Sequence, residues 1–205
     1  ETLFEGIVVR HGIKITGAND ARLVIECRDK VVKMTVGRRN ATYTDQTDKA
    51  VIEALIAAAG LHADVEDTTV RHRELVQHYC SDWDFMLARA EACGLLVAVD
   101  AGKVTVRAPQ TDADAALAVG YGGELLEFHA DIDARTQYSS AQAVSWDAAA
   151  QAVVRGTAAS PANLNAQGNL ESAELAAVVG LGMMRMQAAA SQTPEVLAQW
   201  AEAQQ

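Results

Sequence analysis

The hydrophobic pattern at the start of the chain has a period of two. Between residues 3 and 34 apolar and polar positions alternate. The alternation is clearest at Leu23, Ile25 and Cys27, whose charged neighbours are Arg22, Glu26 and Arg28. This pattern predicts two or three strands that turn at Gly12 and at residues 17–20. A sheet this small leaves its edges unpaired. We therefore expect its missing strands to come from another segment or from another chain.

Residues 44–109 are predicted to form a compact α+β module. Apolar residues at helical spacing predict one helix that begins after Thr47 and ends at Gly60, and a second that begins after Ser81 and ends at Gly94. A hairpin over residues 95–107 follows the second helix. We expect the core of the module to contain five large side chains: Val51, Leu55, Trp83, Met86 and Leu87.

Alternation returns after residue 109. Residues 125–132 are predicted to form strands with Phe128, Ala130 and Ile132 on one side, and residues 143–154 to form two more. A monomer would leave the first of these apolar rows poorly covered. The residues predicted to form an oligomer interface are therefore Phe128, Ala130 and Ile132.

Residues 157–205 are predicted to begin as a loop and to end in helices. Residues 157–170 are small and polar, which is typical of a surface loop. Helical patterns follow at residues 171–179 and 194–204, the second with Thr193 as its N-cap.

Charge and composition exclude several classes of protein. The formal net charge is −10, and residues 111–205 contain three arginines, no lysine and eleven acidic residues. Such a surface repels phosphate backbones, so we expect no direct binding of nucleic acid. No apolar run is long enough to span a membrane. The three cysteines have no paired spacing, which favours reduced thiols in the cytoplasm.

The sequence offers no convincing catalytic, cofactor-binding or metal site. His78 and Cys80 lie two residues apart, but in a strand their side chains would be about 7 Å apart, which is long for a hydrogen bond. The acidic pairs Asp112 and Asp114, Asp131 and Asp133, and Glu124 and Glu127 fit a solvated surface better than a general acid–base pair. Glycine-rich turns lack the residues of a phosphate loop. We predict that the chain is not an enzyme and needs no cofactor.

Several segments together carry a family resemblance. The most specific is S-D-W-D-F at residues 81–85, followed by A-E-A-C-G-L at residues 90–95. Residues 3–9, 24–34, 124–128, 133–135 and 146–147, with the helix that opens at Thr47, agree with it. These segments resemble the VgrG (Rhs element Vgr) proteins and the phage tail hub proteins, over nearly the whole chain.

This resemblance implies a fold class of α+β, mainly β, with tube-type β-barrel domains and a small inserted α+β module. It divides the chain into the end of a first tube domain at residues 1–43, the module at 44–109, a second tube domain at 110–160, and a loop with helices at 161–205. Relative to the family, the chain is expected to be a piece of a longer protein. It would lack the first strands of the first tube domain and stop before the OB domain.

The function that the resemblance implies is that of a structural hub in a contractile injection machine, such as type VI secretion or a phage-tail-like particle. The hub would be a homotrimer that adapts a hexameric tail tube of Hcp-like protein to an OB and β-helix spike, with effector or baseplate proteins as further partners. It would assemble in the cytoplasm and leave the cell with the spike. Two alternatives stay open: an adaptor for a secreted cargo, and the hub domain of a cell-wall-degrading tail enzyme.

Overall fold

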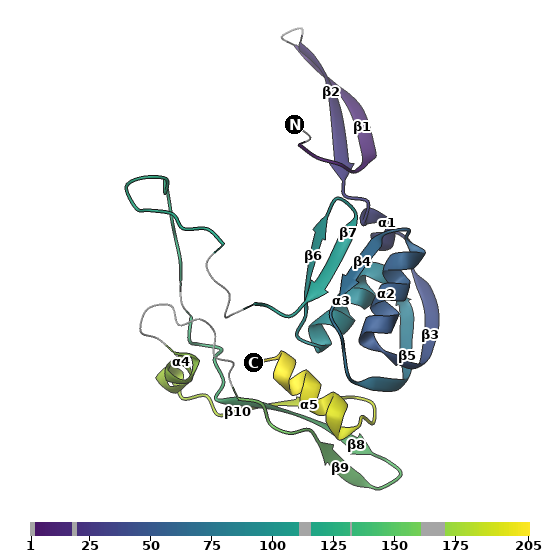
Figure 1. Cartoon of the computed structure of the whole chain (residues 1–205), viewed down its shortest axis with the longest axis vertical. Helices are drawn as coiled ribbons and strands as arrows, with labels where there is room; N and C mark the ends of the chain where they lie inside the picture. Colours follow the sequence, from purple (N-terminus) through teal and green to yellow (C-terminus); the bar gives the residue numbers. More distant parts are fainter. Residues whose placement is uncertain (1–2, 18–19, 111–115, 132, 161–170) are drawn as a thin grey trace. The chain divides into compact units, whose positions relative to one another are not determined.

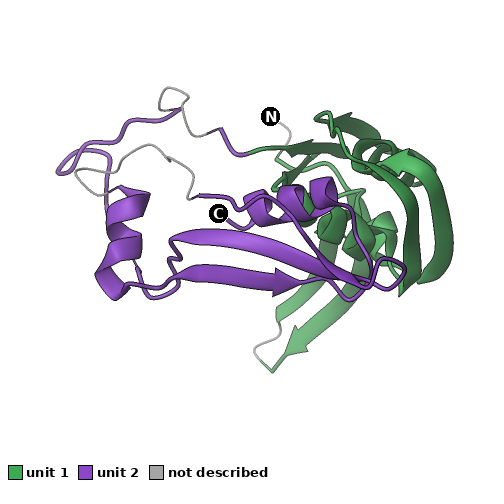
Figure 2. Ribbon diagram, turned by 90° about the horizontal axis from the view of Figure 1, so that it is seen from below, with its two compact units in different colours: residues 1–108 green, residues 109–205 purple. Residues whose placement is uncertain are grey.

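The computed structural model describes residues 3–17, 20–110, 116–131, 133–160 and 171–205. It divides into two compact units, Glu1–Ala108 and Pro109–Gln205 (Figure 2). The fold is mixed α and β, mainly β, as predicted, but its sheets contain only two or three strands and are open. A closed barrel is absent from the described residues, because so few strands per sheet cannot meet edge to edge around an axis. The expected tube-type β-barrel domains, of which the first was expected to be incomplete, are therefore not found as closed barrels in the described residues. The division into four domains stays a prediction.

The first unit begins with a hairpin of β1 (Ile7–Thr16) and β2 (Asp20–Arg28), drawn in purple in Figure 1. The two strands are antiparallel, with Thr16 paired to Asp20 beside the turn and a bulge between Val8 and Arg10. The turn predicted at Gly12 is wrong, since Gly12 lies inside β1 and pairs with Val24. A glycine is compatible with extended backbone, and the pairing of Thr16 with Asp20 shows that the chain reverses between these two residues.

The rest of the first unit contains the α+β module predicted at residues 44–109, together with α1 and most of β3, which precede those bounds. Its elements are α1 (Val32–Thr35), β3 (Arg39–Thr47), α2 (Asp48–Ala58), β4 (His62–Val65), β5 (Arg71–Cys80), α3 (Asp82–Ala92), β6 (Leu96–Asp100) and β7 (Lys103–Arg107). Strand β3 pairs with β5, and the order of the second sheet is β4-β7-β6, with β4 parallel to β7. Both predicted N-caps are confirmed: the Thr47 side chain accepts a hydrogen bond from the Ala50 N–H, and Ser81 accepts one from Asp84.

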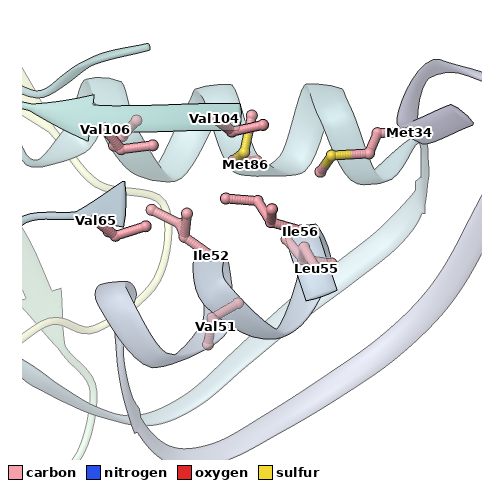
Figure 3. Packing of buried hydrophobic residues seen from close by; sticks show 10 residues of the cluster. Met34, Val51, Ile52, Leu55, Ile56, Val65, Met86, Val104 and Val106 are labelled. Atoms are coloured by element: carbon pink, nitrogen blue, oxygen red, sulfur yellow. The ribbon is translucent and has the colours of Figure 1, made fainter. Parts of the chain in front are cut away.

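The core of the module lies where α2 and α3 meet β4 and β7 (Figure 3). Its buried side chains are Met34, Val51, Ile52, Leu55, Ile56, Val65, Met86, Ala90, Val104 and Val106. Val51, Leu55 and Met86 are thus buried as predicted, and Trp83 packs against the cluster while partly exposed. Leu87 was predicted to be buried as well, but its side chain is 36% exposed. One residue turns a helix by about 100°, so the face that buries Met86 and Ala90 carries Leu87 outward.

The second unit contains a three-stranded sheet covered on one face by a helix. Its elements are β8 (Ser140–Asp147), β9 (Ala152–Arg155), α4 (Ser172–Val179), β10 (Met183–Gln187) and α5 (Pro194–Ala203). The strand order is β10-β8-β9, with β10 parallel to β8. Leu197 and Ala201 of α5 pack against Ala141 and Ala143 of β8. The predicted β8–β9 pair and both helices are confirmed, including the cap in which Thr193 accepts from the Val196 N–H.

Candidate interaction surface

The β1–β2 hairpin has one apolar and one charged face. Directly opposed residues in the two strands share a face, so the pairs Ile13–Leu23, Ile15–Ala21 and His11–Ile25 lie together. We call this set, His11, Ile13, Ile15, Ala21, Leu23 and Ile25, the apolar hairpin face. The alternate pairs Arg10–Glu26, Lys14–Arg22 and Thr16–Asp20 lie on the other side. One face of the hairpin is therefore suited to packing against another apolar surface, and the other face is suited to exposure to solvent.

Nothing among the described residues covers the apolar hairpin face. Ile13, Ile15 and Leu23 are 76%, 75% and 66% exposed. The two strands pair only with each other in the described chain, so both outer edges also carry free backbone N–H and C=O groups. A two-stranded hairpin is marginally stable in water, and contiguous exposed apolar surface marks an interaction site. The apolar hairpin face is the strongest candidate for a functional surface in this chain.

The interface predicted from the sequence lies in the second unit, on a segment without strands. Phe128 is 75% exposed and Ala130 is exposed, whereas Ile132 lies outside the described residues. The predicted strand over residues 125–132 is wrong for the described part, because these residues have no partner strand to hold them in a ladder. Phe128 and Ala130 are thus available to a partner, and their role at an interface stays a prediction.

The residues weighed for catalysis do not form a site. Between His78 and Cys80, Tyr79 adopts a left-handed backbone with φ of 45°, which breaks the regular alternation of β5. Asp131 accepts a hydrogen bond from exposed His129, and Asp133 pairs with Arg135 at 2.5 Å. Both aspartates lie at the surface, where carboxylates are solvated and general acid–base chemistry has no water-poor cleft.

A buried ionic cluster that the sequence did not reveal joins three elements of the first unit. Asp48, at the first position of α2, is fully buried. Its carboxylate accepts from His72 Nε2 of β5 at 2.7 Å, from Arg89 Nε of α3 at 2.6 Å, and from the Cys93 thiol at 3.3 Å. The partners lie 24 to 45 residues away in the chain, so no local pattern indicates them.

The chemistry of this cluster is that of a structural anchor. Burial by itself raises the pKa of Asp48, but hydrogen bonds from His72 and Arg89 outweigh burial and hold the pKa well below its usual value. The aspartate therefore stays ionised at neutral pH, and its oxygens are occupied by donors from β5 and α3. A carboxylate already satisfied in this way fixes neighbouring elements and is a poor base.

Two further properties of the described residues limit the chemistry. Groups of three or more histidine, cysteine or acidic side chains arranged to hold a metal ion are not found there. Among the described helices, none combines the length and the apolar character needed to cross a bilayer.

Comparisons with known proteins place the fold. The family model described as the Alg8 N-terminal domain matches residues 1–205. Among solved structures, the 43 kDa tail protein of prophage MuSo2 from Shewanella oneidensis is similar, with a TM-score of 0.59 at 13% identity over 95% of this chain and 56% of that chain. A tail protein from Neisseria meningitidis MC58 gives a TM-score of 0.62 at 10% identity over 96% of this chain and 57% of that chain. No curated protein matches.

The expected likeness to phage tail proteins is confirmed at the level of the fold. This chain spans somewhat more than half of the length of the two tail proteins. The narrower assignment to VgrG stays a prediction.

Proposed function

The chain belongs to the family of the Alg8 N-terminal domain, and from that premise we propose that it is a structural subunit of a phage-tail-like particle. The observation that carries this proposal is the apolar hairpin face, which is open in a chain whose fold is that of phage tail proteins. A subunit of a tail shares its stability with its neighbours, so surfaces that look unfinished in one copy become interfaces in the assembly.

The more specific form of the proposal is a trimeric hub of a contractile injection machine. In this role three copies adapt a hexameric tail tube to a trimeric spike, and the open two- and three-stranded sheets are completed between copies. The tube protein, an OB and β-helix spike region, and effector or baseplate proteins would be its partners. Assembly in the cytoplasm would precede release with the spike. The unpaired edges of β1 and β2 support this form, since free edges invite pairing with another chain.

The test is the oligomeric state of the full-length protein that contains this chain. Light scattering at micromolar concentration should give the mass of a closed ring, with three copies for a hub. The physical reason is that a subunit matching the end of a tube must itself form a ring. A strictly monomeric full-length protein at that concentration would contradict the hub, and would favour the adaptor for a secreted cargo.

The proposed role is not enzymatic. Purified chain incubated with peptidoglycan or a peptide substrate should show no turnover above a heat-denatured control, because its exposed carboxylates are solvated and the left-handed backbone of Tyr79 separates His78 from the half-buried Cys80. Muramidase or peptidase activity that disappears on replacing Glu124, Glu127 or Cys80 would instead support a cell-wall-degrading tail enzyme.

A further inference from the structure

The sheet of the second unit has a second face that α5 does not cover. In β8, Ala141, Ala143 and Ser145 point toward α5 and are buried, so the alternate residues point the other way. Register extends this outer side to the neighbouring strands, because Trp146 pairs with Val153 and Gln142 pairs with Arg185. We call the set Gln142, Val144, Trp146, Val153, Arg155 and Arg185 the outer sheet face.

This face combines an exposed aromatic centre with positive charge. Trp146 is 52% exposed and Val153 is 42% exposed. Arg155 pairs with Val144 across β9 and β8, so it lies on the same side as Trp146. Neither Arg155 nor Arg185 forms an ion pair with another described residue. Two of the three arginines in residues 111–205 thus lie on one face of an otherwise acidic half of the chain. Tryptophan and arginine are also the residues most enriched at the energetic centres of interfaces.

The same unit carries a segment with the complementary character. Residues 116–131, which we call the acidic-apolar segment, expose large side chains almost completely: Leu126 is 99% exposed and Phe128 is 75% exposed. Glu127 lies between these two residues in the sequence, and Glu124 lies two residues before Leu126. Hydrogen bonds from backbone N–H groups, including that of Gly120, lower the pKa of Glu124, so its carboxylate is charged at neutral pH. The segment therefore offers apolar and negative groups together, and within the described part of the chain its side chains are exposed apart from the half-buried Leu125.

We propose that the acidic-apolar segment of one copy docks on the outer sheet face of a second copy of this chain. Phe128 and Leu126 cover Trp146 and Val153, and the two glutamates pair with Arg155 and Arg185. The reach is sufficient, because the four steps from Glu124 to Phe128 extend up to about 13 Å, which equals the span of the four steps from Gln142 to Trp146 along β8. This inference rests on the proposed assembly and names the surfaces that meet in it.

The contact is heterologous, since a segment on one copy meets a different surface on the next. Head-to-tail contacts of this kind build rings when the rotation closes. A closed ring uses every segment and every outer sheet face once, which would leave neither exposed. The apolar hairpin face is a separate surface of the first unit, and it takes no part in this contact.

Charge reversal tests this pairing directly in the full-length protein. One variant carries Arg155→Glu with Arg185→Glu, and a second carries Glu124→Arg with Glu127→Arg. Each alone places like charges opposite one another and should weaken self-association at least about tenfold in sedimentation velocity. The variant with all four substitutions has the net charge of the unchanged protein and restores opposite charges, so it should associate as the unchanged protein does. It serves as the matched control.

Mixing the two reversed variants gives an outcome that few other arrangements produce. Each variant repels itself, but the face of one attracts the segment of the other, so the mixture should form assemblies with equal numbers of both chains. A ring of three cannot be built from strict alternation, and the trimer should be replaced by even-numbered species.

A photo-cross-linking residue in place of Phe128 identifies the docking site. In a mixture of isotopically heavy and light chains, we expect cross-links between copies to the peptide that holds Trp146 and Val153. Cross-links within one copy, or unchanged association of the reversed variants in a protein that forms rings, would overturn the docking and leave the hub proposal standing. A protein that never self-associates would overturn both.

Discussion

Replacement of Asp48 by Asn is expected to destabilise the first unit by about 3–5 kcal/mol at neutral pH, the usual cost of removing one partner from a buried ion pair. The Asp48 carboxylate is fully buried and accepts from His72 and Arg89 at 2.7 and 2.6 Å. Its loss leaves the Arg89 guanidinium, only 19% exposed, without its anion. Because the three residues come from α2, β5 and α3, the loss should loosen the packing of all three elements.

The same cluster predicts how stability depends on pH. The pKa of Asp48 is lower in the folded chain than in the unfolded chain, so its contribution is fully present above the unfolded value, about pH 4. That contribution is lost as the pH falls below 4 toward the folded value. The difference in unfolding free energy between the unchanged protein and the Asp48→Asn variant should therefore shrink as the pH falls below about 4.

The measurement is urea unfolding followed by the fluorescence of Trp83. Of the three tryptophans, Trp83 alone lies in the first unit, so Trp146→Phe and Trp200→Phe in the background give a signal specific to that unit. Asp64→Asn is the matched control. Hydrogen bonds from Lys103 and Arg107 lower the pKa of Asp64 to about 2, but these partners are about half exposed, so water screens the pair and the loss should be much smaller. Equal losses at Asp48 and Asp64 would show that burial of the Asp48 cluster contributes nothing.

Local signals in the sequence are sufficient to predict the structural features that depend on residues close together in the chain. The caps at Thr47, Ser81 and Thr193 each involve a backbone N–H three residues onward, and the β6–β7 hairpin closes over a turn of two residues. The sequence does not determine which side of α3 faces the core, because the adjacent residues Met86 and Leu87 are both apolar. Only packing against β7 decides which of them faces inward.

Pairings between distant residues were not predicted. Strand β10 pairs in parallel with β8, which precedes it by about 40 residues in the chain. The residues around Phe128, predicted to form a strand, have no partner strand among the described residues. The Asp48 cluster was missed for the same reason, since a single aspartate after an N-cap is the ordinary start of a helix. The alternation at Leu23 and Ile25 indicates part of the apolar hairpin face. The turn wrongly predicted at Gly12 divides β1, so the full length of that face could not be predicted.

Charging the apolar hairpin face is expected to abolish assembly of the full-length protein. The test variant carries Ile13→Lys with Leu23→Lys, two residues that oppose each other across the hairpin. Full burial of such side chains contributes about 1.5–3 kcal/mol each, so their loss should weaken each contact on the order of a hundredfold or more. Light scattering at micromolar concentration should then find monomer in place of a ring.

The chain itself should tolerate this change, because Ile13 and Leu23 are already 76% and 66% exposed within one copy. Circular dichroism should show the unchanged helix and strand content, which separates lost assembly from lost folding. The matched control is Thr16→Lys with Val24→Lys, which adds the same charge to the opposite face of the same hairpin. If this control dissociates the ring as fully as the test variant does, the effect is one of net charge. The apolar hairpin face would then not be the interface. If that face is buried between copies, added charge should disrupt assembly when it lies on that side of the two-stranded hairpin and not when it lies on the other side.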